Sequence, residues 1–279
     1  MNLYRTVTSR QNPFVKELCA LSDKKKRRQT GSFRFDGVKL FEEAVKSNIS
    51  LLNIVIREDV AESLEPLCEY AVECGLVERE GIVCVSTEVF EKISEEKSPE
   101  GVICVAKMQD GLHKKLSAEE LLSELSVGEK ILLAESLRDP GNLGTVMRSC
   151  SALGIDRLIL TDDCADIYSP RTVRAAMGAL FKQKTVTVPL SQMPYAIELL
   201  RKNGRRIYAA ALHREALNID AIEMSAGDAF VIGNEGHGLS EEVINACTSC
   251  AIIPMSEGAE SLNAAAAAAI CIWETVRKR

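Results

Sequence analysis

Short apolar runs alternate with longer amphipathic segments along the second half of the chain, and this alternation most constrains the fold. Six of the runs are typical of buried strands: ILLAES, RLILTD, KTVTVPLS, RRIYAAAL, DAFVIGNE and CAIIPM. Helical segments lie between most of them. Because strands that alternate with helices favour a mostly parallel sheet covered on both faces, residues 130–279 are predicted to form an α/β domain.

The first part of the chain shows the same alternation on a smaller scale. The segment VKLFEEAVKSN places Val38, Phe41 and Val45 on one helical face, and LLNIVI follows as a buried strand. Further helices are predicted at 62–77 and 87–96, and further strands at 81–86 and 101–107.

Two boundaries follow from this pattern. Residues 1–108 are predicted to form a compact α/β unit of their own. Residues 109–129 are polar, carry glycines near both ends and contain one short amphipathic helix, which is typical of a linker.

Basic residues gather at the start of the chain, although the formal net charge of the whole chain is -6. Residues 1–40 hold ten Lys or Arg against three Asp or Glu. This asymmetry favours a phosphate-binding end on an acidic body. A solvated run of charge explains the segment KKKRR equally well.

The cysteines and the lack of long apolar stretches indicate the compartment. No apolar run approaches the ~20 residues that span a bilayer, and the N-terminus lacks a signal-peptide core, so we expect a cytoplasmic protein without a membrane partner. The ten cysteines lie mostly in apolar runs, as buried free thiols do. Only Cys247 and Cys250 form a CxxC pair, and the chain has three histidines, so no metal site is predicted.

Ligands of open parallel sheets bind beyond the carboxyl ends of the strands, so three loops are candidates for chemistry. The first is ESLRDPGNLGTVMRSCSALG, in which Pro140, Gly141 and Gly144 predict a tight turn. A helix that begins near Thr145 would place Arg148 about one turn into it. The loop matches neither a P-loop nor GxGxxG, and by itself it is explained as a strand-to-helix turn.

The second loop, FVIGNEGHGLSEEV, brackets two functional side chains with glycines. Glu235 and His237 alternate with Gly233, Gly236 and Gly238, so the backbone can approach a ligand closely while a carboxylate projects into the site. The serine that follows is a good N-cap for the next helix.

The third loop, IIPMSEGAESLNAAAAAAICIWE, leads into a run of six alanines. Ser261 or a neighbour is predicted to cap the last helix, and alanine is the best helix former. Neither point explains Asn263, which is expected in the first turn, or the absence of large side chains. Small residues allow close packing against another element or a ligand.

Taken in order, the three loops resemble the SpoU or TrmH family of RNA ribose 2'-O-methyltransferases, of the SPOUT class. The residues that carry the resemblance are NxGxxxR at Asn142, Gly144 and Arg148, GNEGHG at 233–238, and IPM followed by SLN at 253–255 and 261–263. The resemblance implies a C-terminal parallel-sheet domain whose chain threads a trefoil knot around S-adenosylmethionine.

The front of the chain resembles the substrate-binding domain of the same family, a small α/β sandwich that grips structured RNA. The matching text runs from TSRQNPF to KLFEEA. Asp36 stands where the family usually has Glu, and Ala176 where Ser is expected, which leaves open any substrate contact of that serine. The RNA contacts that the resemblance implies are those of the basic residues Arg10, Lys16, Lys24, Lys25, Lys26, Arg27 and Arg28.

The family pattern also implies the roles of the site residues. Backbone groups around Gly233, Ile253, Met255 and Leu262 would hold S-adenosylmethionine. Arg148 is the family's catalytic arginine, but a guanidinium stays protonated in proteins, so we expect it to bind the target phosphate and stabilise the developing alkoxide. The residues expected to act with it are Asn142, Glu235, Ser261 and Asn263, of which Glu235 would orient Arg148 or accept a proton. His237 ranks behind them as a base.

The implied partners are RNA and a second copy of the chain. A homodimer is expected, with each active site near the subunit interface. Ribosomal RNA is favoured because a separate N-terminal domain suits a large structured target. The alternatives are a transfer-RNA ribose methyltransferase and a non-catalytic RNA-binding protein of the same fold.

Overall fold

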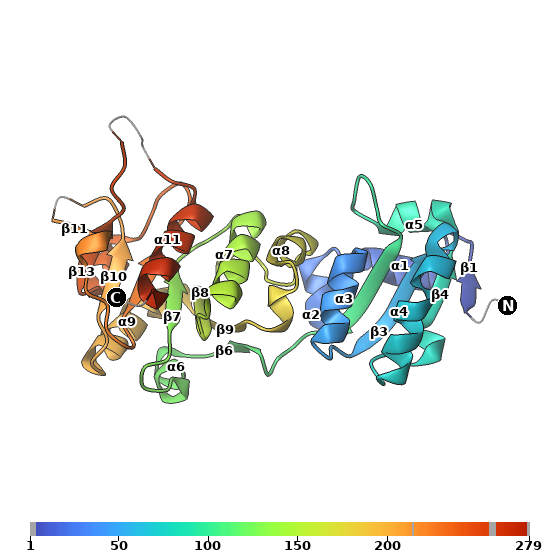
Figure 1. The fold of residues 1–279 in the computed structure, drawn as a ribbon, viewed down its shortest axis with the longest axis horizontal. Helices are drawn as coiled ribbons and strands as arrows, with labels where there is room; N and C mark the ends of the chain where they lie inside the picture. Colours follow the sequence, from blue (N-terminus) through green and yellow to red (C-terminus); the bar gives the residue numbers. More distant parts are fainter. Residues whose placement is uncertain (1–3, 214, 257–260, 278–279) are drawn as a thin grey trace. The chain divides into compact units, whose positions relative to one another are not determined.

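The computed structural model describes residues 4–213, 215–256 and 261–277, which form two compact units (Figure 1). Unit 1 comprises Met1–Gln109 and Tyr168–Phe181, and unit 2 comprises Asp110–Ile167 and Lys182–Arg279. Within the described ranges, no helix combines the length and apolar character needed to cross a bilayer.

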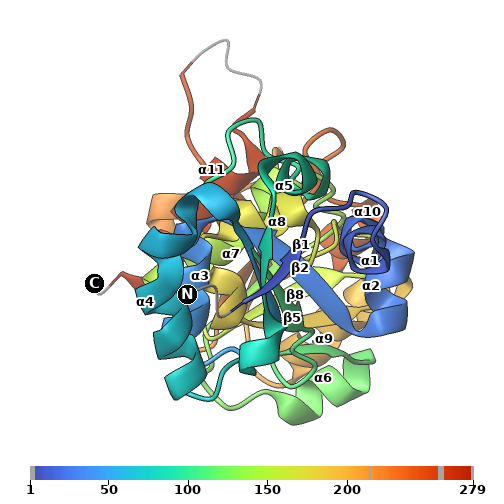
Figure 2. The same ribbon diagram turned by 90° about the vertical axis from the view of Figure 1, so that its right-hand side faces the viewer.

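Unit 1 is built on a five-stranded mixed sheet of order β1-β4-β3-β5-β2, in which β5 runs antiparallel to both of its neighbours. Helices α1 and α5 cover one face of the sheet, and α3 and α4 cover the other (Figure 2). The strands are β1 Arg5–Val7, β2 Ser32–Asp36, β3 Leu51–Arg57, β4 Ile82–Val85 and β5 Val102–Lys107. The helices are α1 Pro13–Ala20, α2 Lys24–Thr30, α3 Val38–Lys46, α4 Ala61–Glu73, α5 Thr87–Ile93 and α8 Pro170–Ala176.

Four elements of unit 1, namely β1, α1, α2 and β2, precede the first element that the apolar periodicity predicted. Their helices are specified by caps rather than by long apolar stripes. The Asn12 side chain accepts from the Phe14 amide and Pro13 opens α1, whereas Asp23 accepts from the Lys26 amide to cap α2. Gly31 then ends α2 with a φ of 62°, a left-handed conformation that glycine adopts without strain.

Unit 2 confirms the predicted parallel sheet: its eight strands are all parallel, in the order β11-β13-β10-β12-β7-β8-β9-β6. The strands are β6 His113–Lys115, β7 Ile131–Ala134, β8 Arg157–Thr161, β9 Lys184–Val188, β10 Ile207–Ala210, β11 Leu217–Asn218, β12 Ala229–Ile232 and β13 Ser249–Ile252. The helices are α6 Ala118–Glu124, α7 Pro140–Leu153, α9 Met193–Lys202, α10 Glu241–Ala246 and α11 Ala264–Val276. Figure 1 shows α11 beside α7.

The structure differs from the expected division in two places. Residues 110–129, where a linker was predicted, belong to unit 2: β6 pairs with β9 at the sheet edge and α6 packs on α9. Residues 168–181 follow β8 in sequence but pack in unit 1, where the Tyr168 and Phe33 ring centroids lie 4.7 Å apart. Contacts between aromatic rings far apart in sequence leave no periodic signal.

Candidate functional site

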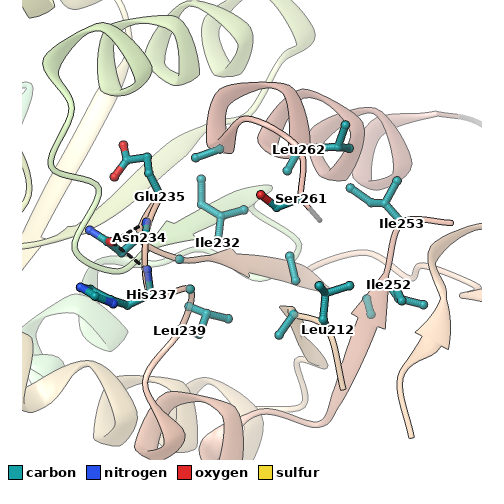
Figure 3. A pocket seen from close by; sticks show the side chains of 18 of the residues that line it. Leu212, Ile232, Asn234, Glu235, His237, Leu239, Ile252, Ile253, Ser261 and Leu262 are labelled. Atoms are coloured by element: carbon teal, nitrogen blue, oxygen red, sulfur yellow. Dashed lines mark hydrogen bonds between the residues drawn. The ribbon is translucent and has the colours of Figure 1, made fainter. Parts of the chain in front are cut away.

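A cavity of about 400 Å³ opens at the carboxyl ends of three neighbouring strands, β13, β10 and β12 (Figure 3). The apolar side chains that line it include Leu212, Ile232, Leu239 and Ile252. The predicted site residues that line it are Gly233, Glu235, Ile253, Met255, Ser261 and Leu262, together with His237. The second and third predicted loops are thus brought together here.

The segment 233–238 forms one wall as a closed turn. The Asn234 and Gly238 backbones exchange hydrogen bonds of 2.9 and 3.0 Å, and the Asn234 Oδ1 accepts from the amides of Gly236 and His237. A Cβ on Gly233 would lie 2.3 Å from the Gly238 carbonyl carbon, so this position admits only glycine without opening the turn. Sequence reasoning named the glycines of this loop but missed Asn234, which organises it.

Helix α7 begins earlier than predicted. Asp139 caps it by accepting from the Asn142 amide at 2.8 Å, and Pro140 is its first residue, so the expected turn followed by a helix near Thr145 is wrong. Proline at N1 of a capped helix explains this start. Arg148 therefore lies about two turns into the helix rather than one.

The Glu235 carboxylate lies against the start of α7. It accepts from the amides of Arg138 and Asp139 at 3.4 and 3.3 Å and from the Asn142 Nδ2 at 3.0 Å. The positive end of a helix favours a carboxylate in this place. Glu235 thus joins the second loop to the first through residues at the start of α7 rather than through Arg148.

Asn263 joins the third loop to the same cluster. Its Oδ1 accepts from the amides of Ala265 and Ala266, so Asn263 is the N-cap of α11. The prediction that Ser261 or a neighbour caps this helix is confirmed for the neighbour, and the prediction that Asn263 lies in the first turn is wrong. Its Nδ2 donates to the Asn142 Oδ1 at 2.9 Å. A hydrogen-bonded chain of Glu235, Asn142 and Asn263 therefore links all three loops.

Arg148 lies outside this cluster. Its side chain is exposed, does not line the cavity, and makes no hydrogen bond or ion pair within the described part of the chain. The guanidinium is therefore available to an external anion.

Glu135 is a buried carboxylate at the end of β7 that sequence reasoning also missed. It is 4% exposed and accepts from the Ser240 amide at 2.8 Å and from the Ser240 Oγ at 2.6 Å. Ser240 in turn caps α10, as predicted. A Glu directly after an apolar strand, in a chain with a capping Ser after the glycine loop, is the signal that could have identified this pair.

Comparison with known proteins identifies the family. Residues 129–273, more than half of the chain, match the model of the SpoU rRNA Methylase family, and residues 12–104 match the MRM3-like substrate binding domain. The chain belongs to the SpoU rRNA methylase family.

Full-length relatives support this assignment. The chain is 29% identical over 269 residues to the 23S rRNA (guanosine(2553)-2'-O)-methyltransferase RlmP of Bacillus subtilis, covering 96% of this chain and 98% of that one. It is 29% identical to a 23S rRNA (uridine(2479)-2'-O)-methyltransferase of Streptomyces viridochromogenes, covering 99% and 93%. The AdoMet-bound rRNA methyltransferase of Sinorhizobium meliloti has the same fold, with a TM-score of 0.81, 28% identity and 98% of both chains covered.

The basic residues of this SpoU family member divide into exposed and buried ones. Arg10, Lys16, Lys24, Lys25 and Arg28 are exposed, and Lys26 is half-buried. Arg27 is 2% exposed and donates to the carbonyls of Leu21 and Ser22 at the end of α1, so it is a structural residue rather than a surface contact. Arg27 has this role because it lies on the buried side of α2.

The two departures from the family pattern both lie in unit 1. Burial raises the pKa of the Asp36 carboxyl, although Arg34 and the Ser94 hydroxyl act in the opposite direction. Ala176 is fully buried, so a side chain at this position has no open surface on which to meet a substrate.

The CxxC pair lies at the junction of α10 and β13, with Cys247 directly after the helix and Cys250 in the strand. Burial raises the pKa of the Cys247 thiol to about 12 and also raises that of Cys250. Within the described ranges, no group of three or more His, Cys, Asp or Glu is arranged to hold a metal ion.

Proposed function

We propose that this protein transfers a methyl group from S-adenosylmethionine to a ribose 2'-hydroxyl of ribosomal RNA. The observation that carries the proposal is the cavity at the carboxyl ends of β13, β10 and β12, whose walls come from two of the three family motifs. The Glu235, Asn142 and Asn263 chain ties the remaining motif to them.

The residues present fit S-adenosylmethionine. A cavity of about 400 Å³ lies within the usual size range of small-molecule sites, and its apolar walls suit an adenine ring. Gly233, Ile253, Met255 and Leu262 would hold the donor, largely through backbone groups at the strand ends. When bound, the donor supplies an electrophilic methyl group on its sulfonium.

The chain's own residues would align the acceptor and stabilise its charge. Methylation of a hydroxyl requires an oriented oxygen and the loss of one proton. We assign Arg148 to the target phosphate and to the alkoxide that develops, because its guanidinium is exposed and has no intramolecular partner among the described residues. Ser261 lines the cavity and would orient the ribose. Glu235 and Asn142 hold the loops in place, so a direct role of Glu235 as base is less favoured than the sequence alone suggested.

We also propose a homodimer with each site near the subunit interface, in a cytoplasmic protein. The position of Arg148 outside the cavity and the 54% exposure of Trp273 on α11 support this arrangement. The trefoil knot that the family resemblance implies likewise stays a prediction. Light scattering of the purified protein tests the dimer directly.

Unit 1 is proposed as the RNA-binding domain. It matches the family's substrate-binding domain, and it carries the exposed lysines of α2. The RNA on which the relatives act, by their names, is 23S rRNA, which favours ribosomal over transfer RNA.

Two measurements test the proposed function. Calorimetry with S-adenosylmethionine should show binding to the purified protein, and no binding at millimolar donor would favour a non-catalytic RNA-binding protein. Mapping of ribose methylation in a deletion strain should show one lost site in ribosomal RNA. A site lost from transfer RNA instead would reject the ribosomal assignment.

A further inference from the structure

Ser136 has a backbone conformation that serine rarely adopts. It lies two residues beyond the end of β7 with a φ of 54°. Within the described ranges, the other non-glycine residues with positive φ are Asn48 and Met177, both in unit 1. Such conformations persist only where surrounding contacts impose them.

Three hydrogen bonds impose this conformation. The Ser136 amide donates to the Thr161 Oγ1 at 2.8 Å, and its hydroxyl donates to the Asp163 Oδ2 at 2.6 Å. Its carbonyl accepts from the Asn234 Nδ2 at 2.8 Å. Because β7 lies between β8 and β12 in the sheet, Ser136 connects the carboxyl ends of three adjacent strands.

The bond to Asn234 determines how the cavity wall is held. With its Nδ2 fixed on the Ser136 carbonyl, the Asn234 amide presents its Oδ1 to the amides of Gly236 and His237. Asn234, Gly236 and His237 all line the cavity. The orientation of this wall therefore depends on where the Ser136 carbonyl points.

Asp163 provides the fixed point for the Ser136 hydroxyl. It also accepts from the Thr161 Oγ1 at 2.7 Å and from the Arg138 Nη2 at 3.0 Å. Partial burial acts to raise the pKa of the Asp163 carboxyl, but these hydrogen bonds outweigh it and lower the pKa below its ordinary value. The carboxylate is thus ionised at neutral pH, as an acceptor for three donors must be.

We propose that Ser136 is a positioning residue for the donor cavity: its left-handed backbone directs its carbonyl to Asn234 and its hydroxyl to Asp163, which fixes the 233–238 wall. Ser136 does not itself line the cavity, so it acts through Asn234. The identity of the ligand rests on the proposed function, but the positioning of the wall does not.

The test compares Ser136→Gly, Asn234→Ala and the double variant by calorimetry with S-adenosylmethionine. Glycine keeps the backbone groups and adopts positive φ freely, so Ser136→Gly should fold with an unchanged Tm while losing the anchor on Asp163. We expect its donor Kd to rise about 5-fold and that of Asn234→Ala about 20-fold. The double variant should bind like Asn234→Ala alone, because the two residues act in one chain of contacts.

Two control variants isolate the effect. Ser94→Gly removes a hydroxyl that donates to the Asp36 carboxylate in unit 1, and Met177→Gly introduces glycine at the positive φ of Met177. Both should bind the donor as the wild type does.

A second readout needs no ligand. Hydrogen exchange at the amides of Gly236 and His237 should be faster in Ser136→Gly than in the wild type, because the carbonyl that holds the Asn234 amide is no longer fixed by a hydroxyl bond to Asp163. If the wild type fails to bind the donor, the proposed function falls and exchange alone decides the positioning role. If the wild type binds the donor, two results would show that this inference is wrong while the proposed function stands. The first is a donor Kd of Ser136→Gly within 2-fold of the wild-type value, with unchanged amide exchange. The second is a double variant in which the effects of Ser136→Gly and Asn234→Ala on the donor Kd add independently.

Discussion

Two arginines of unit 1 and one arginine of unit 2 lie in opposite environments. In unit 1, Arg27 and Arg34 are each 2% exposed, and their guanidinium groups donate to backbone carbonyls and, for Arg34, to Glu95. In unit 2, Arg148 extends from α7 into solvent with no side-chain partner among the described residues. A basic residue in a promising segment is therefore available to a ligand only if the fold leaves it unpaired.

Replacement of Arg148 should have the largest effect on activity. Arg148→Ala removes a charge that we assign to the transition state, so turnover should fall about 100- to 1,000-fold. The donor Kd and the Tm should stay near the wild-type values, since the side chain touches neither the cavity nor the core. Single-turnover methylation of ribosomal RNA and calorimetry measure the two quantities. A variant that binds donor poorly but still turns over would reject the assignment.

The same substitution in unit 1 should have the opposite result. Arg27→Ala leaves the carbonyls of Leu21 and Ser22 without their buried donor, which should lower the free energy of unfolding by about 2 to 3 kcal/mol. Arg28→Ala, one residue along and exposed, is the matched control and should leave stability within about 0.5 kcal/mol. Urea unfolding checks both, and equal stabilities would contradict the structural role of Arg27.

The exposed Lys and Arg side chains of α2 test whether unit 1 also has basic residues that bind RNA. Replacing Lys24, Lys25 and Arg28 together by Ala should weaken RNA binding at low salt. The slope of log K against log salt should become shallower by about 0.7 to 0.9 for each phosphate that the variant no longer neutralises. Filter binding across a salt series measures the slope, with donor affinity as the control. An unchanged slope would mean that KKKRR is a solvated face.

Two substitutions of Asn263 separate its role as N-cap of α11 from its hydrogen bond to Asn142, and their effects should be smaller. Asn263→Ser keeps a good N-cap for α11 but removes the amide that donates to Asn142, whereas Asn263→Ala removes both. Unfolding should show a decrease in stability of about 1 kcal/mol for Ala and little for Ser. Turnover should fall in both variants. If Ser restored turnover fully, the link between the first and third loops would have no part in catalysis.

The smallest expected difference between the two units is in the reactivity of their thiols. Burial raises the pKa of Cys247 to about 12, so its reactive thiolate is scarce at pH 8, whereas Cys74 in unit 1 is exposed. Iodoacetamide should therefore modify Cys74 in the native protein and leave Cys247 intact, as peptide mass spectrometry would show. Rapid labelling of Cys247 would indicate that the α10 and β13 junction opens.

Much of the architecture could be predicted from the sequence alone. The six apolar runs became β7, β8, β9, β10, β12 and β13, because buried parallel strands require continuous apolar residues. The glycine-rich motif lines the cavity together with Ile253, Met255, Ser261 and Leu262, since loops that follow neighbouring parallel strands meet at one edge of the sheet.

Only the tertiary structure decided which partner each polar side chain takes. Glu235 accepts hydrogen bonds from the start of α7, Asn263 donates to Asn142, and Arg27 points inward, although their neighbours in sequence indicate none of this. Periodicity reports how a segment contributes to a core, which is a local property. Hydrogen bonds between residues some 90 to 120 positions apart depend on how the strands are ordered in the sheet, and no local pattern encodes that order.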